Sequence, residues 1–450
     1  MPEVIENRRQ FDELLQSCTN YENLPAFHAG RVRTDLERMR VYAERLGHPE
    51  RAAPVLHVTG TKGKGSTSMQ AARLLSRLLG PTGLHTSPHL VRMEERVQID
   101  GQPIGEAALF AATNQILAAR AAPPDPGFPT FFEFITLVAM LEFRRAGVRA
   151  AVHEVGLGGR LDATNIVMPA VTICTNLSLE HTAVLGATID EIAREKAGIV
   201  KPGVPLVTGV RPGAPGFAIL DQAAQAARAP LLALDRELSV ERVRRARAGG
   251  LEIDLRILDR RYLGLRTRFI GAHQAENLAL ALAGVELLVP EPDASQVAAG
   301  LADLNLPGRL ERVGEHPIIL LDGAHTRESV ALALHEAQAL EPDRIVALFA
   351  MAVDKDRDGA ARVLARADHV IATRYDSPRA SDPTDLAHRV RRCGGQAEVG
   401  EDPESALRRA CRLADREGLV LVVGSLYLAG LVRSLMQATN AAGGPSPWNM

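Results

Sequence analysis

The first chemically suggestive feature of this sequence is a pair of lysines in a glycine-rich stretch. Lys62 and Lys64 lie within VLHVTGTKGKGSTS, residues 55–68, although only five of the 52 lysines and arginines in the 450 residues are lysines. A glycine-rich turn between a buried strand and a helix lets backbone N–H groups converge on phosphate oxygens. A lysine there reaches the terminal phosphates of a nucleotide, and a hydroxyl such as that of Ser66 can reach Mg²⁺. The stretch therefore predicts a phosphate-binding loop.

This loop departs from the strict phosphate-loop pattern G-x-x-x-x-G-K-[ST]. Val58 occupies the first glycine position, and Gly65 separates Lys64 from Ser66. The alternative is an ordinary tight turn between a strand and a helix. The choice of lysine favours phosphate binding, because a flexible ammonium group can follow phosphates where a planar guanidinium is too bulky.

Candidate metal ligands follow two other predicted strands. HEVGLGGRLDATN, residues 153–165, places Glu154 and Asp162 in a glycine-rich loop, and TNLSLEHTAVLG, residues 175–186, supplies His181. Ligands bind at the carboxyl ends of strands in open α/β sheets. Glu154 and His181, at the ends of neighbouring strands, therefore predict a shared metal site. A plain turn and a structural histidine are the alternatives.

Two further segments carry candidate site residues. GLHTSPHLVRMEERVQI offers Ser87 as a hydroxyl ligand and Arg92 and Arg96 as anion contacts, with a solvated loop as the alternative. EIAREKAGIVKPG carries Lys196 on a predicted helix whose other charges suggest a solvated face. A lysine retained in a chain that otherwise uses arginine argues for a chemical role instead.

A parallel sheet is needed to bring these residues together, and the sequence predicts one. Apolar strands at 53–59, 150–156 and 170–176 alternate with helical stretches such as 131–147. This alternation predicts an α/β fold with a doubly wound, mostly parallel sheet of the P-loop ATPase kind. Residues 251–270 indicate an antiparallel hairpin at the edge of that sheet.

The chain is too long for one hydrophobic core, and a second α/β series begins after NLPGRLERV. We expect a larger domain over residues 1–304 and a smaller, Rossmann-like domain over 305–438. The remaining residues, 439–450, have linker composition and predict a disordered tail.

Composition limits the classes of partner. The net charge is −2, with 24% charged and 46% hydrophobic residues, so no broad surface for nucleic acid or anionic membranes is expected. The four cysteines are scattered and suggest neither a disulfide framework nor a thiolate metal site. The N-terminus lacks the apolar run of a signal peptide, and no apolar stretch is long enough to span a membrane. We therefore expect a cytoplasmic protein.

Taken in order, the motifs resemble those of the folylpolyglutamate synthase/dihydrofolate synthase family of Mur-type ligases. The resemblance runs from about His57 to about Gly430, nearly the whole chain. It implies that residues 1–304 form an ATP-binding central domain of the Mur-ligase type and that residues 305–438 form a domain of the glutamate-ligase type. So many motifs in one order are highly specific. They are HVTGTKGKGST, TSPHLVRMEERV, PTFFEF, EVGLGGRLDATN, LSLEHTAVLG, EKAGIVKPG, GAHQAENLALALA, LPGRLE, LDGAH, DKDRD and VVGSLYLAG.

The resemblance implies a role for individual residues. It implies that Lys64, Lys196 and His181 are catalytic, with Lys196 carbamylated, a change open to lysine and closed to arginine. The implied Mg²⁺ ligands are Ser87, Glu154 and His181. The implied ATP contacts are Lys62, Gly63, Lys64, Gly65, Ser66, Asn277, Arg309 and Asp322. The implied pterin-side pocket comprises Thr130, Phe131, Phe132, Glu133, Leu161, Asp162 and Ala163.

The sequence departs from the family pattern at four positions. Lys62 and Thr326 each stand where asparagine is usual, Glu180 stands where aspartate is usual, and Val353 interrupts the usual Ala-Asp-Lys run. The first departure adds positive charge at the phosphate loop. None removes an expected metal ligand.

The implied reaction is the ATP-dependent joining of L-glutamate to a pteroyl or folyl carboxylate through an acyl phosphate, by a monomer that uses ATP and two Mg²⁺ ions. The GGRLDATN loop and PTFFEF favour dihydropteroate as acceptor, hence dihydrofolate synthase with or without folylpolyglutamate synthase activity. A monofunctional folylpolyglutamate synthase acting on a reduced folate is the alternative.

Two hypotheses from other classes remain. A P-loop phosphotransferase would form no amide bond, and Lys196 and the second domain argue against it. A non-catalytic nucleotide-binding paralogue is suggested by the four departures, and the retained Glu154, His181 and Lys196 argue against that one.

Overall fold

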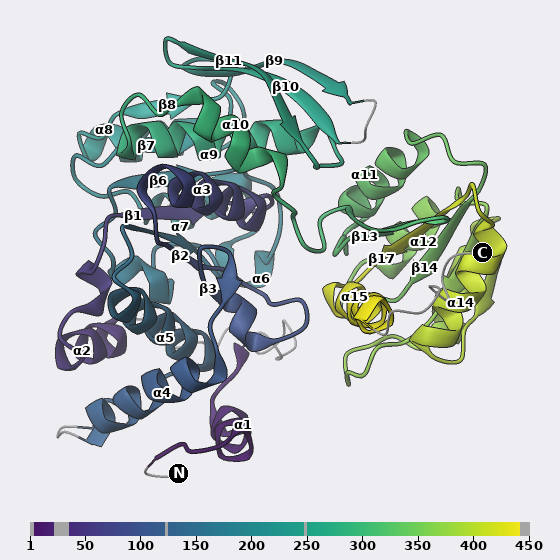
Figure 1. Ribbon diagram of the computed structural model, residues 1–450, viewed down its shortest axis with the longest axis horizontal. Helices are drawn as coiled ribbons and strands as arrows, with labels where there is room; N and C mark the ends of the chain where they lie inside the picture. The colour runs from purple at the N-terminus through teal and green to yellow at the C-terminus, as the bar shows by residue number, and fades with distance from the viewer. Residues whose placement is uncertain (1–3, 22–35, 122–124, 247–249, 442–450) are drawn as a thin grey trace. The chain divides into compact units, whose positions relative to one another are not determined.

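The computed structural model describes residues 4–21, 36–121, 125–246 and 250–441. The chain divides into two compact units, one of residues 1–268 and 272–304 and the other of residues 269–271 and 305–450. We call them unit 1 and unit 2. Each has a mostly parallel sheet of its own (Figure 1).

The main sheet of unit 1 carries the candidate site. Its described strands lie in the order β4-β3-β2-β5-β1-β6-β7-β8. The pairs from β2 to β8 are parallel, and β3 and β4 add an antiparallel edge. The strands are β1 (Val55–Thr59), β2 (Thr82–His85), β3 (Val97–Ile99), β4 (Gln102–Pro103), β5 (Ala150–Glu154), β6 (Val171–Cys174), β7 (Leu206–Thr208) and β8 (Leu231–Ala233).

Helices cover both faces of this sheet. As a result, β1, β5 and β6 are buried along their whole lengths and expose no polar face. The helices of unit 1 are α1 (Arg8–Ser17), α2 (Glu37–Arg45), α3 (Lys64–Leu79), α4 (Glu106–Ala121), α5 (Phe131–Ala146), α6 (Thr182–Leu185), α7 (Ile189–Ala197), α8 (Phe217–Ala226), α9 (His273–Leu288) and α10 (Ala294–Ala302). Short 3₁₀ turns are η3 (Pro49–Arg51), η4 (Met93–Arg96) and η5 (Ala163–Ile166).

Helices α5 and α9 both pack against the strands of this sheet. Phe134 and Phe143 of α5 are buried in the main core of unit 1. Helix α9 packs closely on the sheet, since a Cβ atom at Gly284 would come within 2.8 Å of Leu56 on β1 and Ile173 on β6. Burying apolar side chains on both faces fixes the strands whose ends carry the site.

The expected hairpin over 251–270 forms, but in a different place. Its strands β10 (Leu251–Ile257) and β11 (Arg260–Thr267) pair with β9 (Leu238–Arg245) in a separate antiparallel sheet instead of extending the main sheet. Figure 1 shows this sheet beyond α9 and α10, on the side away from the main sheet. The expectation was wrong here because β9, which the sequence did not single out, provides the pairing partner of β10.

Unit 2 has a sheet with the described order β12-β13-β17-β14-β15-β16, parallel except for β12. The predicted α/β class with a second, smaller α/β unit is confirmed. The strands are β12 (Glu311–Glu315), β13 (Ile318–Leu321), β14 (Ile345–Phe349), β15 (His369–Ala372), β16 (Ala397–Val399) and β17 (Leu419–Val423). The helices are α11 (Arg327–Gln338), α12 (Arg357–Leu364), α13 (Pro383–Arg392), α14 (Pro403–Ala414) and α15 (Leu426–Ala441).

The last helix runs past the predicted start of the tail. Helix α15 ends at Ala441, whereas we expected the folded part to end at 438. The rest of the predicted tail, 442–450, lies outside the described residues. Over the described part of the chain, no helix has the length and apolar character needed to cross a membrane.

Candidate active site

The glycine-rich loop has the geometry of a phosphate-binding loop. It connects the end of β1 at Thr59 to the start of α3 at Lys64. Gly60 and Gly63 have φ angles of +144° and +81°, and a Cβ atom at Gly60 would lie 1.8 Å from Thr175 Oγ1. Only glycine fits there, because any side chain would collide with the continuation of β6. The loop thus directs the N-terminus of a helix, with its partial positive charge, at the sheet edge.

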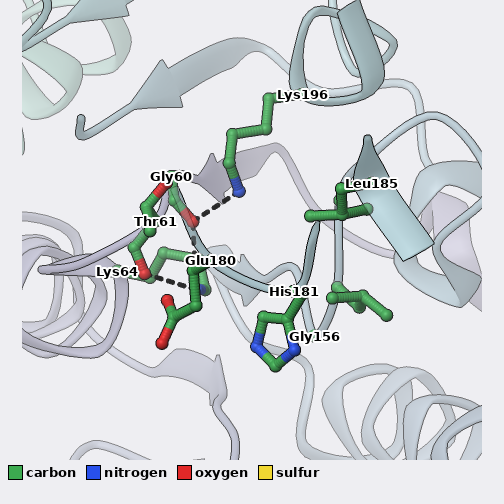
Figure 2. Close-up of a pocket in the computed structure, with 10 residues that line it drawn as sticks. Gly60, Thr61, Lys64, Gly156, Glu180, His181, Leu185 and Lys196 are labelled. Atoms are coloured by element: carbon green, nitrogen blue, oxygen red, sulfur yellow. Dashed lines mark hydrogen bonds between the residues drawn. The ribbon is translucent and has the colours of Figure 1, made fainter. Parts of the chain in front are cut away.

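Two lysines converge on one carbonyl oxygen of this loop. Lys196 Nζ donates to the Gly60 carbonyl at 2.7 Å, and Lys64 Nζ donates to the same oxygen at 3.1 Å (Figure 2). Burial and the neighbouring Lys64 ammonium lower the pKa of Lys196 to about 8. The two groups therefore create a cationic centre in which Lys196 loses its proton unusually easily.

A small pocket opens beside these lysines. Lys64 and Lys196 line it together with Glu180 and His181, which come from the segment before α6. The sequence did not single out the other lining residues, and only the glycine-rich composition of their segments hinted at them. They are Gly60, Thr61, Gly156, Leu157, Gly158 and Leu185.

Glu154 and Ser87 meet at the ends of neighbouring strands. Glu154 is buried at the end of β5, and its Oε2 accepts a hydrogen bond of 3.1 Å from the Ser87 backbone N–H. The carboxylate also faces the first turn of α3, since a Cβ atom at Gly65 would lie 3.6 Å from Oε2. Ser66, in the same turn, is buried.

This donor set suits a hard divalent cation such as Mg²⁺, which prefers oxygen ligands and keeps several waters. The described residues contain no cluster of three or more His, Cys, Asp or Glu side chains able to hold a metal. Glu154, Ser87 and His181 would therefore need further ligands from a nucleotide phosphate, from water or from a modified Lys196. His181 lines the pocket, whereas Ser87 and Glu154 contact one another, and the shared metal site stays a prediction.

The remaining expected nucleotide contacts lie in both units. In unit 1, the Asn277 side chain of α9 occupies the space beside Gly63, and its amide donates to Gln274 Oε1 at 3.0 Å. In unit 2, Arg309 Nη1 donates to the Gly308 carbonyl at 3.0 Å. Asp322 accepts from the backbone N–H groups of Leu310 and Ala324, at 2.8 and 2.7 Å.

Two residues expected in the pterin-side pocket start helix α5. Thr130 and Glu133 form a capping box, in which Glu133 Oε2 accepts from the Thr130 N–H at 2.7 Å. Glu133 also forms an ion pair of 2.8 Å with Arg38. The sequence pattern T-x-x-E before an apolar run is the signal that marks this helix start.

The neighbouring aromatic residues pack in different directions. Phe131 is buried beneath Arg96, whose guanidinium lies 4.9 Å from the ring centroid. Arg96 is itself buried and donates to His89 Nδ1 at 2.8 Å. The interpretation of Arg96 as an anion contact stays a prediction, and Arg92 is exposed. Phe132 packs against the backbone of Gly156, beside the pocket.

Asp162 organises the loop that lines the pocket. It is buried, and its carboxylate accepts from the backbone N–H groups of Leu157 and Thr164, both at 3.0 Å, and from the Thr164 hydroxyl at 2.5 Å. Burial raises the pKa of this carboxyl, while the Thr164 and Leu157 hydrogen bonds oppose the rise. On either side of it, Leu161 is half-buried and Ala163 is buried.

Asp162→Ala is expected to lower the free energy of unfolding by about 2–4 kcal/mol, because several buried donors lose their acceptor. It should also raise the KM of a pteroyl acceptor more than the Kd of a nucleotide, since Leu157 lines the pocket. Denaturant unfolding and acceptor titration measure the two effects. Asp190→Ala, at an exposed position of α7, is the control. Equal losses of acceptor use and nucleotide affinity would mark the loop as structural only.

Two of the four departures have local structural explanations. Thr326 caps α11 through a capping box with Ser329, a role that threonine and asparagine share. Val353 is 48% exposed, and its backbone N–H donates to the Arg379 carbonyl at 2.8 Å. The other two departures, Lys62 and Glu180, contact one another.

The chain matches known protein families over most of its length. Residues 58–285 match the family described as Mur ligase middle domain, and residues 308–426 match the Mur ligase, glutamate ligase domain. A dihydrofolate synthase/folylpolyglutamate synthase of Bacillus subtilis is 34% identical over 435 residues, which cover 93% of this chain and 100% of the relative. The chain belongs to the dihydrofolate synthase/folylpolyglutamate synthase family. The resemblance inferred from the motifs and the assignment to a ligase class of enzymes are confirmed.

Two further relatives of this family show its range. A probable bifunctional folylpolyglutamate synthase/dihydropteroate synthase of Haloferax volcanii is 35% identical over 408 residues; the match covers 90% of this chain but only 48% of that longer relative. The structure of a bifunctional folylpolyglutamate synthase/dihydrofolate synthase of Yersinia pestis, complexed with AMPPNP and Mn ion, has a TM-score of 0.83. It is 30% identical, and the match covers 97% of this chain and 100% of that one.

Proposed function

We propose that this protein joins L-glutamate to a pteroyl or folyl carboxylate at the expense of ATP. The observation that carries this proposal is the convergence of Lys64 and Lys196 on the Gly60 carbonyl of the phosphate loop, beside a pocket. Because two ammonium groups bond the same carbonyl oxygen, positive charge is concentrated there, and this charge favours the binding of an anion nearby. The named ligands of the Yersinia pestis relative, a nucleotide analogue and a divalent metal ion, are of the kind this site suits.

The reaction would proceed in two steps. The acceptor carboxylate attacks the γ-phosphorus of ATP, so that an acyl phosphate forms and ADP leaves. The amine of L-glutamate then attacks the acyl carbon, and the tetrahedral intermediate collapses to an amide with release of inorganic phosphate and a proton. Phosphoryl transfer depends on positioning and charge neutralisation more than on covalent help from the protein.

The phosphate loop supplies the positioning. Its backbone N–H groups and the N-terminus of α3 attract the phosphates. The Lys64 ammonium, held on Gly60, would neutralise the negative charge that develops on the transferred group. Glu154, Ser87 and His181 would hold Mg²⁺, for which we propose two ions; when bound, Mg²⁺ supplies Lewis-acid neutralisation of phosphate charge.

Lys196 is proposed to act as a carbamate. Its pKa of about 8 leaves more neutral amine near neutral pH than an ordinary lysine has. The amine nitrogen adds to CO₂, a proton leaves to solvent, and the side chain becomes an anion. The repulsion between Lys196 and Lys64 then becomes an attraction, and two oxygen ligands for a hard cation appear.

For the acceptor we propose dihydropteroate, with a reduced folate as a second substrate. The bifunctional names of the Bacillus subtilis and Yersinia pestis relatives support this choice. The Leu161 to Ala163 loop and the start of α5 are the proposed acceptor side of the site. A monofunctional folylpolyglutamate synthase would use only the reduced folate.

ADP release is expected to require both an acceptor carboxylate and L-glutamate. The measurement is ADP production with dihydropteroate or tetrahydrofolate, each with and without labelled glutamate. Label should appear in an amide product with dihydropteroate, and also with tetrahydrofolate if the enzyme is bifunctional. Equal ADP release without any amino acid would indicate a phosphotransferase instead.

A further inference from the structure

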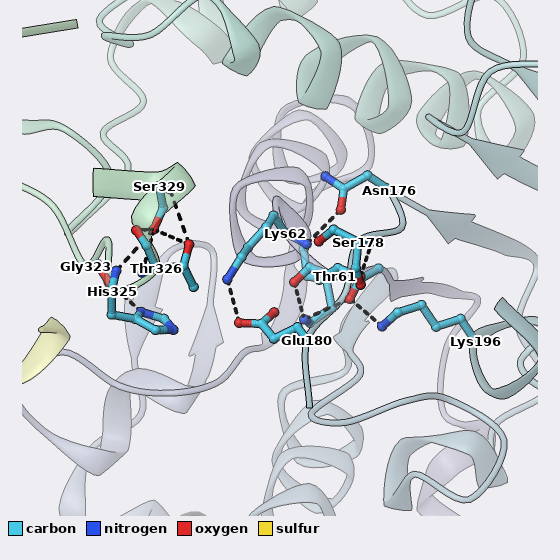
Figure 3. Close-up of polar contacts among 12 residues, drawn as sticks. Thr61, Lys62, Asn176, Ser178, Glu180, Lys196, Gly323, His325, Thr326 and Ser329 are labelled. Carbon is cyan, nitrogen blue, oxygen red and sulfur yellow. Dashed lines mark hydrogen bonds and ion pairs between the residues drawn. The ribbon is translucent and has the colours of Figure 1, made fainter. Parts of the chain in front are cut away.

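Lys62 and Glu180 form an ion pair at the edge of the pocket. Lys62 Nζ lies 2.5 Å from Glu180 Oε1, and the two side chains are 38% and 16% exposed (Figure 3). The residues are 118 positions apart in the sequence. The pair joins the phosphate loop to the segment that ends in His181.

The backbone of the loop is held in place by other contacts. The Lys62 N–H donates to Asn176 Oδ1 at 2.9 Å, the Thr61 N–H donates to the Asn176 carbonyl at 3.0 Å, and Thr175 Oγ1 donates to the Lys62 carbonyl at 2.6 Å. The Lys62 ammonium is therefore not needed to anchor the loop. Its partner Glu180 immediately precedes His181, which has a left-handed backbone with φ of 51°.

The arrangement of charges suggests what the ammonium does. Among the described residues that line the pocket, Glu180 is present and Lys62 is not. Lys64 and Lys196 already direct their ammonium groups into the pocket. A carboxylate in the pocket wall repels an incoming phosphate, and the repulsion is large where water is partly excluded. Lys62 lies where it neutralises that carboxylate from outside.

We propose that Lys62 is a positioning residue that acts through Glu180: it cancels the carboxylate charge in the pocket wall, so that nucleotide phosphates can bind. In this account Lys62 does not bind phosphate itself. The inference rests on the proposed function, because it concerns the same nucleotide site.

A double-mutant cycle separates this role from direct phosphate binding. The measured quantity is the Kd of ADP with Mg²⁺, by calorimetry, for the wild type, Lys62→Met, Glu180→Gln and the double variant. Lys62→Met is expected to raise the Kd about two- to fivefold, the range that corresponds to a partly exposed ion pair. Glu180→Gln keeps an acceptor oxygen for Lys62 and should stay within about twofold of the wild type. The double variant should also return to within about twofold, because no uncompensated carboxylate remains.

Two further readouts distinguish the charge effect from a structural one. The rise in Kd caused by Lys62→Met should be smaller at high salt, where exposed charges are screened. Steady-state assays should show a larger change in the KM for ATP than in kcat. Glu241→Gln is the matched control, since Glu241 forms a 2.9 Å ion pair with Arg261 in the separate antiparallel sheet. Its nucleotide Kd should equal that of the wild type.

If Lys62→Met raised the Kd by the same factor in the wild type and in Glu180→Gln, the inference would be overturned. Lys62 would then bind phosphate directly. No penalty in Lys62→Met would overturn it as well. Absence of nucleotide binding in the wild type would instead refute the proposed function itself.

Discussion

Lys196→Ala is expected to be inactive in glutamate ligation, and acetate is expected to restore part of its activity. The Lys196 side chain is 4% exposed and donates to the Gly60 carbonyl from inside the pocket. Alanine leaves a space of the size that a short carboxylate can fill, beside the Lys64 ammonium. An anion in that space would replace the oxygens of the proposed carbamate.

Lys196→Arg is expected to be inactive and not rescued. The guanidinium keeps its charge at every accessible pH and cannot add CO₂, and its bulk occupies the space that acetate would need. Lys201→Ala is the matched control: burial also lowers the pKa of Lys201, but its ammonium bonds the Asn165 carbonyl at 3.3 Å, away from the lysines on Gly60.

The measurements are initial ligation rates across acetate concentrations and detection of a lysine carbamate with isotopically labelled CO₂. The second readout does not depend on activity. Full activity in Lys196→Arg would contradict the carbamate proposal. An unmodified Lys196 amine in a well-resolved structure with Mg²⁺ bound would contradict it equally.

Lys64→Ala is expected to lower kcat by about 10²–10³, the usual effect of losing one preorganised electrostatic donor. A second effect should add to the first. The Lys64 ammonium is one of the causes that lower the pKa of Lys196, so its removal should raise that pKa and reduce the neutral amine available for carbamate formation.

The fold of Lys64→Ala should be unchanged. Lys64 is half-buried at the start of α3, and the loop conformation depends on Gly60 and Gly63 rather than on this side chain. Thermal unfolding should therefore match the wild type, while single-turnover ADP formation slows. Lys355→Ala, in unit 2, controls for loss of a lysine. Normal turnover in Lys64→Ala would show that the loop does not bind phosphate as proposed.

Much of the architecture follows from local sequence. Mostly apolar runs such as 55–59 predict strands buried on both faces, and the glycines at 60 and 63 predict a turn whose backbone conformation other residues rarely adopt. The order of the motifs along the chain is enough to indicate the family. These signals are local, because periodicity and backbone demands act within a few residues.

Which side chains contact one another could be seen only in the tertiary structure. β1 lies between β5 and β6, so residues after β1 meet residues after β6, and the Lys62–Glu180 pair arises from that neighbourhood. The same holds for Lys64 and Lys196 on Gly60. Their spacing in the sequence carries no signal of the contact.

The two α/β series, the glycine-rich turn before α3 and the ligase family follow from the sequence alone. Three features could be seen only once the chain was folded: Asp162 bonds its own loop, Phe131 is buried beneath Arg96, and β10 and β11 pair with β9 instead of joining the main sheet. The physical reason is that a polar side chain settles wherever burial leaves a donor or acceptor to satisfy. Which groups are buried depends on how distant strands and helices pack.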